Sequence, residues 1–280
     1  MWQVRQSARD DERQTRRLVE RAERVTILFF AEKLADHLEQ EPFLLIERDG
    51  ELRGFLSFTI TRPPQAVLVA AGLADDWAIS PWLDHLLPRC EAHLRGQGAA
   101  FLSYAGSASW LINPLQARGF RFISNIVVYN KPDCAFSEMG NEETRIRPVR
   151  TDDFPSLVAL DALVFHLRWR NSAETLADWR ASLPYFVVAI ADKEPVGYCY
   201  CSIEGEHGHL IRLAVHPAWQ GLGIGTRLAT EAMLFFERSA VKGVTLNTQE
   251  ENEQAQKLYR KLGFQLAGRK AVALWKELAE

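Results

Sequence analysis

A glycine-rich turn between an apolar strand and a helix is the part of this sequence whose residue types best suit chemistry. The strand is expected over residues 210–215, and the helix that follows the turn carries apolar residues on one face. Glycine lets the backbone approach a ligand closely, and the free N–H groups and dipole of a helix N-terminus attract an anion. The pattern therefore predicts an anion site for a pyrophosphate, although glycines here can also serve only to turn the chain. The turn reads Gln220, Gly221, Leu222, Gly223, Ile224, Gly225 and Thr226.

A second strand and helix follow and carry a tyrosine and an asparagine. The strand is expected over residues 244–248, and the helix begins after Asn252 and ends at Gly263. Asn252 is a favourable N-cap, and Gly263 is a favourable left-handed C-cap. Tyr259 lies on the apolar face of this helix. From its position alone, this tyrosine could simply pack as a core aromatic.

Together these two stretches resemble the GNAT superfamily of acyl-CoA-dependent N-acyltransferases. The resemblance extends from near Thr144 to the C-terminus. The pyrophosphate motif of that family, Gln/Arg-x-x-Gly-x-Gly/Ala, corresponds here to Gln220, Gly223 and Gly225. Its second motif, Asn-x-x-Ala-x-x-Leu-Tyr followed by Gly-Phe, corresponds to Asn252, Ala255, Leu258, Tyr259, Gly263 and Phe264.

The resemblance implies a binding mode for acetyl-CoA, or another acyl-CoA, as co-substrate. The backbone of Leu213, Ala214 and Val215 would bind the pantetheine arm where the sheet splays open. The N–H groups from Gly221 to Thr226 would hold the pyrophosphate, with the Thr226 hydroxyl as a further donor. Tyr259 would protonate the departing CoA thiolate, and Asn252 would contact CoA as well as cap its helix. The expected reaction is direct acetyl transfer in a ternary complex to a primary amine of a small molecule or peptide.

The general base and the acceptor stay open at this stage. Some members of the family carry a Glu on the strand before the Asn, where this chain has Asn247, so no base is assigned. Residues 166–179 and the segment around Arg269 are expected to form the acceptor pocket. Arginines there would suit an acidic acceptor or simply lie on the surface. The base candidates, each of which could equally be a solvated charge, are Glu204, Glu206, His207, His209, Glu250 and Glu251.

An internal repeat predicts that the chain contains two copies of one fold. Val4-Arg5, Arg53-Gly54 and Gly119-Phe120 recur as Ile146-Arg147, Val196-Gly197 and Gly263-Phe264, at spacings of 142 to 144 residues. The expected fold class is α/β of the α+β type, with two tandem GNAT-like domains. Each domain would be a mixed, mostly antiparallel sheet flanked by helices. The expected ranges are 1–130 and 144–280, joined by a polar linker over 131–143.

The first copy is expected to be degenerate and not to bind the cofactor. Asp76, Ile79 and Pro81 stand where the second copy has Gln220, Gly223 and Gly225, and Leu115 stands where it has Tyr259. Proline has no N–H to donate to a phosphate. The expected elements of this copy include a helical region from Asp10 to about Leu38 and a final pair of strands over 120–129. One functional cofactor site per chain is therefore predicted.

Composition and charge bear on three further questions, which are nucleic-acid binding, cellular location and metal binding. The 280 residues are 47% hydrophobic and 25% charged, with a formal net charge of −3 and no long run of Lys or Arg, so nucleic-acid binding is not expected. No apolar run reaches the length of a membrane span and no signal peptide is expected, so the predicted location is the cytoplasm. The four cysteines lack metal-ligand spacing, and no metal site is predicted.

Three further points are left as alternatives. The chain could be a monomer or a homodimer. It could be a non-catalytic acyl-CoA sensor that uses Tyr259 only for packing. It could also be a protein-binding module that uses its degenerate first half.

Overall fold

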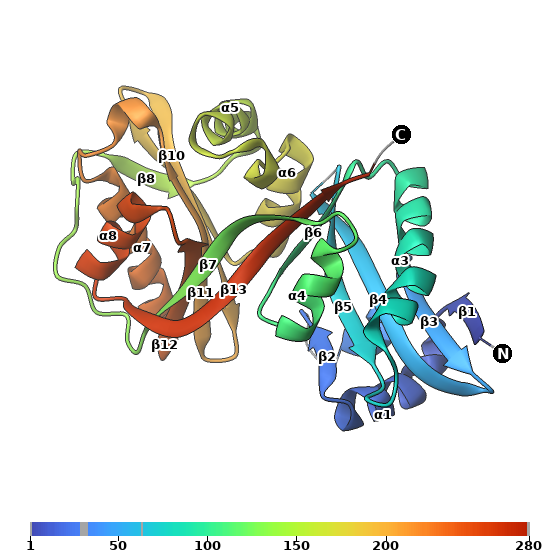
Figure 1. Cartoon of the computed structure of the whole chain (residues 1–280). Coiled ribbons are helices and arrows are strands. Elements are labelled where there is room, and N and C mark those ends of the chain that lie inside the picture. Colours follow the sequence, from blue (N-terminus) through green and yellow to red (C-terminus); the bar gives the residue numbers. More distant parts are fainter. Residues whose placement is uncertain (1, 29–32, 63, 279–280) are drawn as a thin grey trace. The chain divides into compact units, whose positions relative to one another are not determined.

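The structure is a computed structural model that describes residues 2–28, 33–62 and 64–278. The chain forms two compact units (Figure 1). The first comprises Met1–Ser124 together with Ala271–Glu280, and the second comprises Asn125–Lys270. Both units contain α-helices and a mixed sheet, as the sequence predicts.

The first unit is built on a sheet in the order β1-β3-β4-β5-β6-β13, with β2 paired to β5. Neighbouring strands run antiparallel except β5 and β6, which pair in parallel. The strands are β1 (Trp2–Gln6), β2 (Arg24–Ile27), β3 (Phe43–Arg48), β4 (Glu51–Arg62), β5 (Gln65–Leu73), β6 (Phe101–Gly106) and β13 (Gln265–Glu277). The helices are α1 (Glu12–Arg21), α2 (Leu34–Leu38), α3 (Ile79–Gly96) and α4 (Ser109–Gln116).

The second unit repeats this arrangement in the order β7-β12-β11-β10-β9-β8. Here β11 and β12 form the parallel pair. The strands are β7 (Arg121–Lys131), β8 (Arg145–Pro148), β9 (Tyr185–Ala191), β10 (Glu194–Glu204), β11 (His207–Val215) and β12 (Gly243–Gln249). The helices are α5 (Phe154–Val164), α6 (Ala173–Ser182), α7 (Ile224–Arg238) and α8 (Glu253–Lys261), and a short 3-10 turn, η4 (Leu167–Trp169), precedes α6.

The last strand of each sequence copy completes the sheet of the other copy. Strand β7, at the end of the first copy, pairs with β12 from Val244↔Lys131 to Gln249↔Ile126. Strand β13, at the end of the second copy, pairs with β6 from Val272↔Gly106 to Glu277↔Phe101. The compact units therefore differ from the expected continuous ranges 1–130 and 144–280. The expected linker, 131–143, lies in the second unit.

Two expected elements of the first copy are wrong. The helical region from Asp10 to Leu38 is interrupted by β2, because Val25, Thr26 and Ile27 are β-branched and pair with the edge of β5. The expected pair of strands over 120–129 is one strand, β7, which continues through Ser124 and Asn125 because its later residues, Ile126 to Lys131, pair with β12. Both differences come from a partner strand that lies far away in the sequence.

The structure gives both copies the same ion pair at the start of the repeat. Arg5 donates two hydrogen bonds of 2.7 Å to Asp11, and Arg147 donates two of 2.7 Å to Asp153. Each aspartate also accepts a backbone N–H three residues before it, from Ala8 or Arg150. Both copies therefore fix the turn between the first strand and the first helix in the same way.

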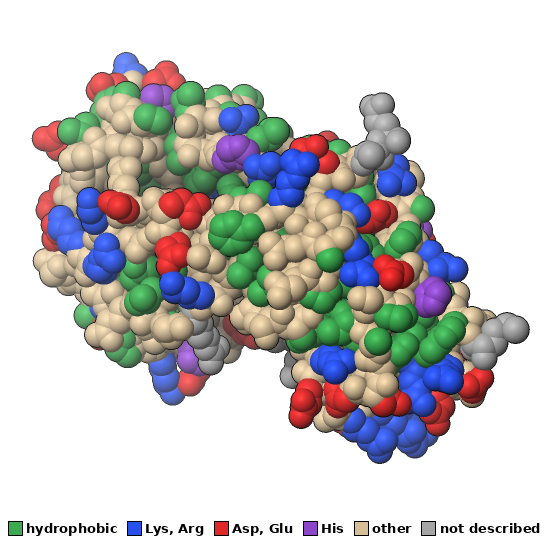
Figure 2. Space-filling model, in the orientation of Figure 1, with side chains coloured by type: hydrophobic (Ala, Val, Ile, Leu, Met, Phe, Trp, Pro, Cys, Tyr) green, Lys and Arg blue, Asp and Glu red, His purple; other side chains and the backbone are tan. Residues whose placement is uncertain are grey.

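The surface carries charges of both signs. Acidic and basic side chains are mixed over the face that Figure 2 shows. Within the described residues, none of the helices is both long enough and apolar enough to cross a membrane.

Candidate functional site

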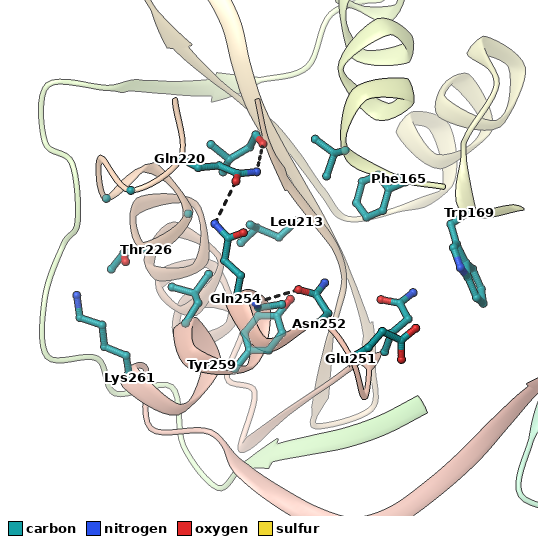
Figure 3. Close-up of a pocket in the computed structure, with 18 of the residues that line it drawn as sticks. Phe165, Trp169, Leu213, Gln220, Thr226, Glu251, Asn252, Gln254, Tyr259 and Lys261 are labelled. Atoms are coloured by element: carbon teal, nitrogen blue, oxygen red, sulfur yellow. Dashed lines mark hydrogen bonds between the residues drawn. The ribbon is translucent and has the colours of Figure 1, made fainter. Parts of the chain in front are cut away.

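A cleft of about 590 Å³ lies in the second unit, between the end of β11, the start of α7, one side of α8 and the turn before α6 (Figure 3). Most of the residues predicted from the glycine turn and the second motif line it. The lining consists of Val164, Phe165, His166, Trp169, Leu213, Val215, Gln220, Gly221, Gly223, Gly225, Thr226, Gln249, Glu251, Asn252, Gln254, Ala255, Leu258, Tyr259 and Lys261.

The cleft exists because two parallel strands separate. Strands β11 and β12 are paired from His207↔Gly243 only as far as Leu210↔Leu246. The register of β11 against β10 also shifts beyond Leu210, which leaves Ile211 as an extra residue. Beyond this bulge, Leu213 and Val215 line the cleft, whereas Ala214 is buried in the core on the other side of the sheet. Among the described strands, none therefore pairs with this end of β11 on the side of the cleft.

The glycine turn presents unused backbone donors. Gly221 and Gly223 have φ angles of 78° and 79°, in the left-handed region that favours glycine. In the described chain, none of the N–H groups of residues 221–226 donates to another backbone or side-chain group. A Cβ on Gly225 would meet Leu258 at 3.3 Å, so this position lets α7 approach α8 closely. The described part of the turn therefore presents undonated N–H groups at the N-terminus of a 15-residue helix, which is the arrangement that an anion site requires.

Leu222 and Ile224 are also predicted to bind the cofactor, but their side chains do not line the cleft, so only their backbone can contact a ligand there. The Leu222 side chain is 53% exposed, and the Ile224 side chain is buried in the core. The Gln220 side chain instead supports the turn, because its Nε2 donates to the Val215 carbonyl at 3.0 Å. Gln254 of α8 donates to Gln220 Oε1 at 3.1 Å, which joins the turn to α8 across the cleft (Figure 3).

Residues 138–141 of the expected linker hold the outer side of the turn. The Asn141 backbone N–H donates to the Gly223 carbonyl at 3.2 Å, and Asn141 Nδ2 donates to the Leu222 carbonyl at 2.9 Å. A Cβ on Gly140 would lie 2.4 Å from the Arg227 nitrogen, so only glycine fits there. Sequence reasoning missed this segment because irregular chain has no periodicity to mark its contacts.

Tyr259 and Asn252 lie on the α8 side of the cleft (Figure 3). Tyr259 is 6% exposed, and its ring centre is 6.1 Å from the ring centres of both Tyr129 and Phe264. Burial raises the pKa of Tyr259, so the phenol keeps its proton at neutral pH. Asn252 Oδ1 accepts the Ala255 N–H at 3.1 Å and caps α8, as predicted.

Of the six candidate bases, Glu251 is among the residues that line the cleft. Glu204 and His207 are opposite each other in the strand register at one end of β10 and β11. Val215 lies at the other end of β11. The other three are engaged elsewhere in the second unit. Glu206 pairs with Lys242 at 2.6 Å, Glu250 with Lys270 at 2.5 Å, and His209 Nδ1 lies 2.9 Å from Thr245 Oγ1.

The expected acceptor segment supplies part of the opposite wall. His166 and Trp169 line the cleft, together with Val164 and Phe165, which sequence reasoning did not select. Arg170 Nε donates to the Phe165 carbonyl at 3.0 Å and so holds this wall in place. The side chain of Arg269, the other expected acceptor residue, lies outside the described part of the chain.

The first copy has its own strand where the second copy has this cleft. Strands β5 and β6 also separate, after Val67↔Ser103. However, β2 pairs with the open edge of β5 from Arg24↔Leu73 to Ile27↔Ala70. Counted along the repeat, β2 corresponds to residues 166–169, and this edge of β5 corresponds to residues 212–215. The groove of the first copy is therefore closed by backbone hydrogen bonds.

The aspartates of the degenerate loop are also engaged in the first copy. The Asp75 carboxylate accepts the Glu23 N–H at 3.0 Å, and Asp76 pairs with Arg53 at 3.2 Å. The loop that precedes α3 therefore carries two carboxylates, whose negative charge disfavours a bound phosphate.

Comparison with known proteins agrees with this geometry. The model of the acetyltransferase (GNAT) family matches residues 149–264. An N-alpha-acetyltransferase of Sulfurisphaera tokodaii is 30% identical over 138 residues, which cover 44% of this chain and 81% of that protein. The chain belongs to the GNAT acetyltransferase family.

Two further relatives of this GNAT chain differ in how much of it they cover. The peptidyl-lysine N-acetyltransferase YjaB of Salmonella typhimurium is 33% identical over 99 residues, which span 35% of this chain and 62% of that protein. The crystal structure of a GCN5-related N-acetyltransferase from Sphaerobacter thermophilus matches 100% of this chain and 96% of its own, with a TM-score of 0.73 and 18% identity. The structural match therefore covers both copies of the repeat, whereas each of the two sequence matches covers about the length of one copy.

The described residues contain no group of three or more His, Cys, Asp or Glu side chains arranged to hold a metal ion. Cys199 and Cys201 are both buried in the core of the second unit, with their sulfur atoms 3.9 Å apart. Burial raises the pKa of Cys201, which suits a packing role for this thiol.

Proposed function

We propose that the second unit transfers an acetyl group from acetyl-CoA to a primary amine by direct attack in a ternary complex. The observation that carries this proposal is the convergence of three features on one cleft. These are the separated end of β11, the free N–H groups at the start of α7, and the buried phenol of Tyr259. Family membership supports acetyl transfer as the chemistry.

Acetyl-CoA would supply an acyl group activated as a thioester, and the chain would supply binding sites of matching chemistry. The N–H groups from Gly221 to Thr226, with the Thr226 hydroxyl, bind the pyrophosphate. The backbone of Leu213, Ala214 and Val215 lies beyond the paired part of β11 and β12 and binds the amides of the pantetheine arm. A backbone N–H of this strand end also stabilises negative charge on the acyl oxygen as the amine attacks.

Tyr259 donates the proton that the departing thiolate needs. A thiol of pKa about 8.5 leaves more readily when a neutral phenol is held close to the sulfur. Since burial raises the pKa of Tyr259, the donor form is fully populated at neutral pH. Asn252 fixes the start of α8 and so the position of Tyr259, seven residues along the chain.

The same proposal assigns one cofactor site to each chain. In the first copy, β2 occupies the strand edge that would bind pantetheine, and Asp75 and Asp76 occupy the loop that would bind phosphate. Residues 1–130 therefore act as a structural partner that supplies β7 to the second unit.

Isothermal titration with acetyl-CoA tests the proposal. The expected result is one site per chain, which Gly223→Pro abolishes. Proline cannot adopt the positive φ of residue 223, and it removes one N–H donor. Gly50→Pro is the matched control, since Gly50 also has a positive φ, of 82°, in a turn of the first unit. A second site, or none, would contradict the proposal.

The alternative, a non-catalytic acyl-CoA sensor, predicts the same single site. It differs in the role of Tyr259, which would then only pack. Release of CoA thiol in the presence of a panel of amines separates the two functions.

A further inference from the structure

Lys261, the last residue of α8, gives the cleft a fixed positive charge. Among the described residues that line the cleft, it is the one lysine or arginine. It lies at the glycine-turn end of the cleft, on the same side as Thr226 (Figure 3). Its Nζ is 2.7 Å from a carboxylate oxygen of Glu138, and the two side chains are 59% and 38% exposed. The one fixed cation of the cleft therefore lies near the predicted anion site but is already paired.

Glu138 is held in place by α7. Its carbonyl accepts a hydrogen bond of 3.0 Å from the Thr230 hydroxyl. Three residues later, Asn141 binds the carbonyls of Leu222 and Gly223. The pair between Glu138 and Lys261 thus joins a segment fastened to α7 with the end of α8, and these two helices border the cofactor end of the cleft.

The pair is poorly suited to hold the two helices together. An exposed ion pair in water is weak, because solvent and salt screen it. The 3′-phosphate of CoA and its pyrophosphate as a whole each carry more charge than a carboxylate and have more acceptor oxygens. The free N–H groups of residues 221–226 add a positive potential that favours a phosphate at this end of the cleft.

We propose that Lys261 binds a phosphate group of acyl-CoA, and that Glu138 competes for Lys261 until the cofactor arrives. The inference rests on the proposed function, since acyl-CoA supplies the phosphate. It adds a binding residue outside the glycine turn and gives the segment between the copies a role in setting cofactor affinity. The phosphate is either the pyrophosphate or the 3′-phosphate, and the chemistry of recognition is the same for both.

A simpler interpretation gives Lys261 only a structural role. A cation in the last turn of a helix stabilises the helix dipole without any ligand. That role predicts a lower unfolding temperature for Lys261→Gln and an unchanged affinity for CoA. Lys257, one turn earlier on α8, provides the matched control. Its Nζ is 3.8 Å from Glu253, its side chain is 74% exposed, and it does not line the cleft.

The test is isothermal titration of the full chain with CoA and with dephospho-CoA, which lacks the 3′-phosphate. Lys261→Gln is expected to weaken CoA binding about tenfold, the usual effect of losing one charge-assisted contact. Lys257→Gln is expected to stay within about twofold of the parent chain, because its charge is exposed and remote. Glu138→Gln is expected to tighten CoA binding about threefold, because it removes the competing carboxylate.

The two ligands identify the phosphate. If Lys261→Gln weakens CoA but not dephospho-CoA, the contact is to the 3′-phosphate, and equal weakening places it at the pyrophosphate. The proposal is overturned if Lys261→Gln binds CoA as tightly as Lys257→Gln does. It is also overturned if Glu138→Gln tightens binding equally in the Lys261→Gln background, because the carboxylate would then act on the ligand directly. A parent chain that binds no CoA would instead refute the proposed function.

Discussion

The guanidinium carbon of Arg212 lies 3.5 Å from the centre of the Phe165 ring. Phe165 lines the cleft, and Arg212 directly precedes Leu213 on β11. Arg212 also donates to the buried carboxylate of Asp161 at 2.6 Å, and that carboxylate accepts the Asn171 N–H at 2.6 Å. Asp161 and Asn171 flank residues 164–169, which supply one wall of the cleft. A buried ion pair therefore ties this wall to the strand that borders the cofactor side.

Arg212→Met is expected to destabilise the protein by about 3–5 kcal/mol, because it leaves the Asp161 carboxylate buried without its charged partner. Denaturant unfolding measures the change. Arg147→Met is the control, since the pair of Arg147 with Asp153 lies outside the cleft and is more exposed. Adding Asp161→Asn to Arg212→Met should recover part of the loss. The interpretation fails if Arg212→Met costs no more than Arg147→Met.

Tyr259→Phe is expected to slow acetyl transfer at least about 100-fold, the lower range for loss of a general acid, with little change in acetyl-CoA affinity. Tyr129→Phe is the matched control. Its ring centre is 6.1 Å from that of Tyr259, but its hydroxyl donates to Gln256 and does not line the cleft. Steady-state rates and titrations separate the two effects. An equal rate for Tyr259→Phe and the parent chain would remove Tyr259 from the mechanism.

The rate should also persist to high pH. Burial raises the pKa of Tyr259 above the usual tyrosine value of about 10. The protonated donor is therefore retained as pH rises through 10, and any alkaline fall in rate caused by this phenol comes later. A pH–rate profile measured with a saturating amine checks this. A decline near pH 9 that is absent from Tyr259→Phe would contradict it.

A fragment of residues 144–280 should be less stable than a fragment of residues 120–280. The longer fragment keeps β7, which pairs with β12 over Ile126–Lys131 and buries Val127 and Tyr129 in the core of the second unit. Both fragments lack β6, so the end of β13 loses its partner strand in both, and this loss does not affect the difference in stability between them. Thermal unfolding of the two fragments measures the difference. Equal melting temperatures would show that neither β7 nor the following residues up to 143 contribute much.

Asp153 should make stability depend on pH in the acid range. The hydrogen bonds from Arg147 and from the Arg150 N–H hold the pKa of this carboxyl below its usual value. A lowered folded-state pKa stabilises the protein above the unfolded value of about 3.9, and that contribution is lost as pH falls through the folded-state pKa. Asp153→Asn should therefore be less stable than the parent chain at pH 7, with a gap that closes below about pH 4. Denaturant unfolding of the parent chain and Asp153→Asn at pH 7 and at pH 3 measures this gap, and a gap that stays the same would contradict the prediction.

The sequence by itself predicted the chemistry at the glycine turn and on α8. The positive φ of Gly221 and Gly223, the cap at Asn252 and the left-handed Gly263 are local features, so residue type and spacing are enough to predict them. The internal repeat and the loss of glycines in the first copy could also be recognised from residue type and spacing alone. For this reason the expected cofactor loop and the expected general acid both lie along one cleft.

Only the tertiary structure decided which segments complete the two copies. Strand pairing depends on which edge is open, and the sequence of a single strand does not encode its partner. This is why β7 and β13 each pair with a strand of the other copy, and why residues 24–27 close a groove as β2. It is also why His166 and Trp169, in the corresponding segment of the second copy, line a cleft instead. The contacts of Glu138 with Lys261 and of Arg212 with Phe165 could not be predicted for the same physical reason. Each joins residues far apart in the sequence, and only packing of the chain against itself brings them together.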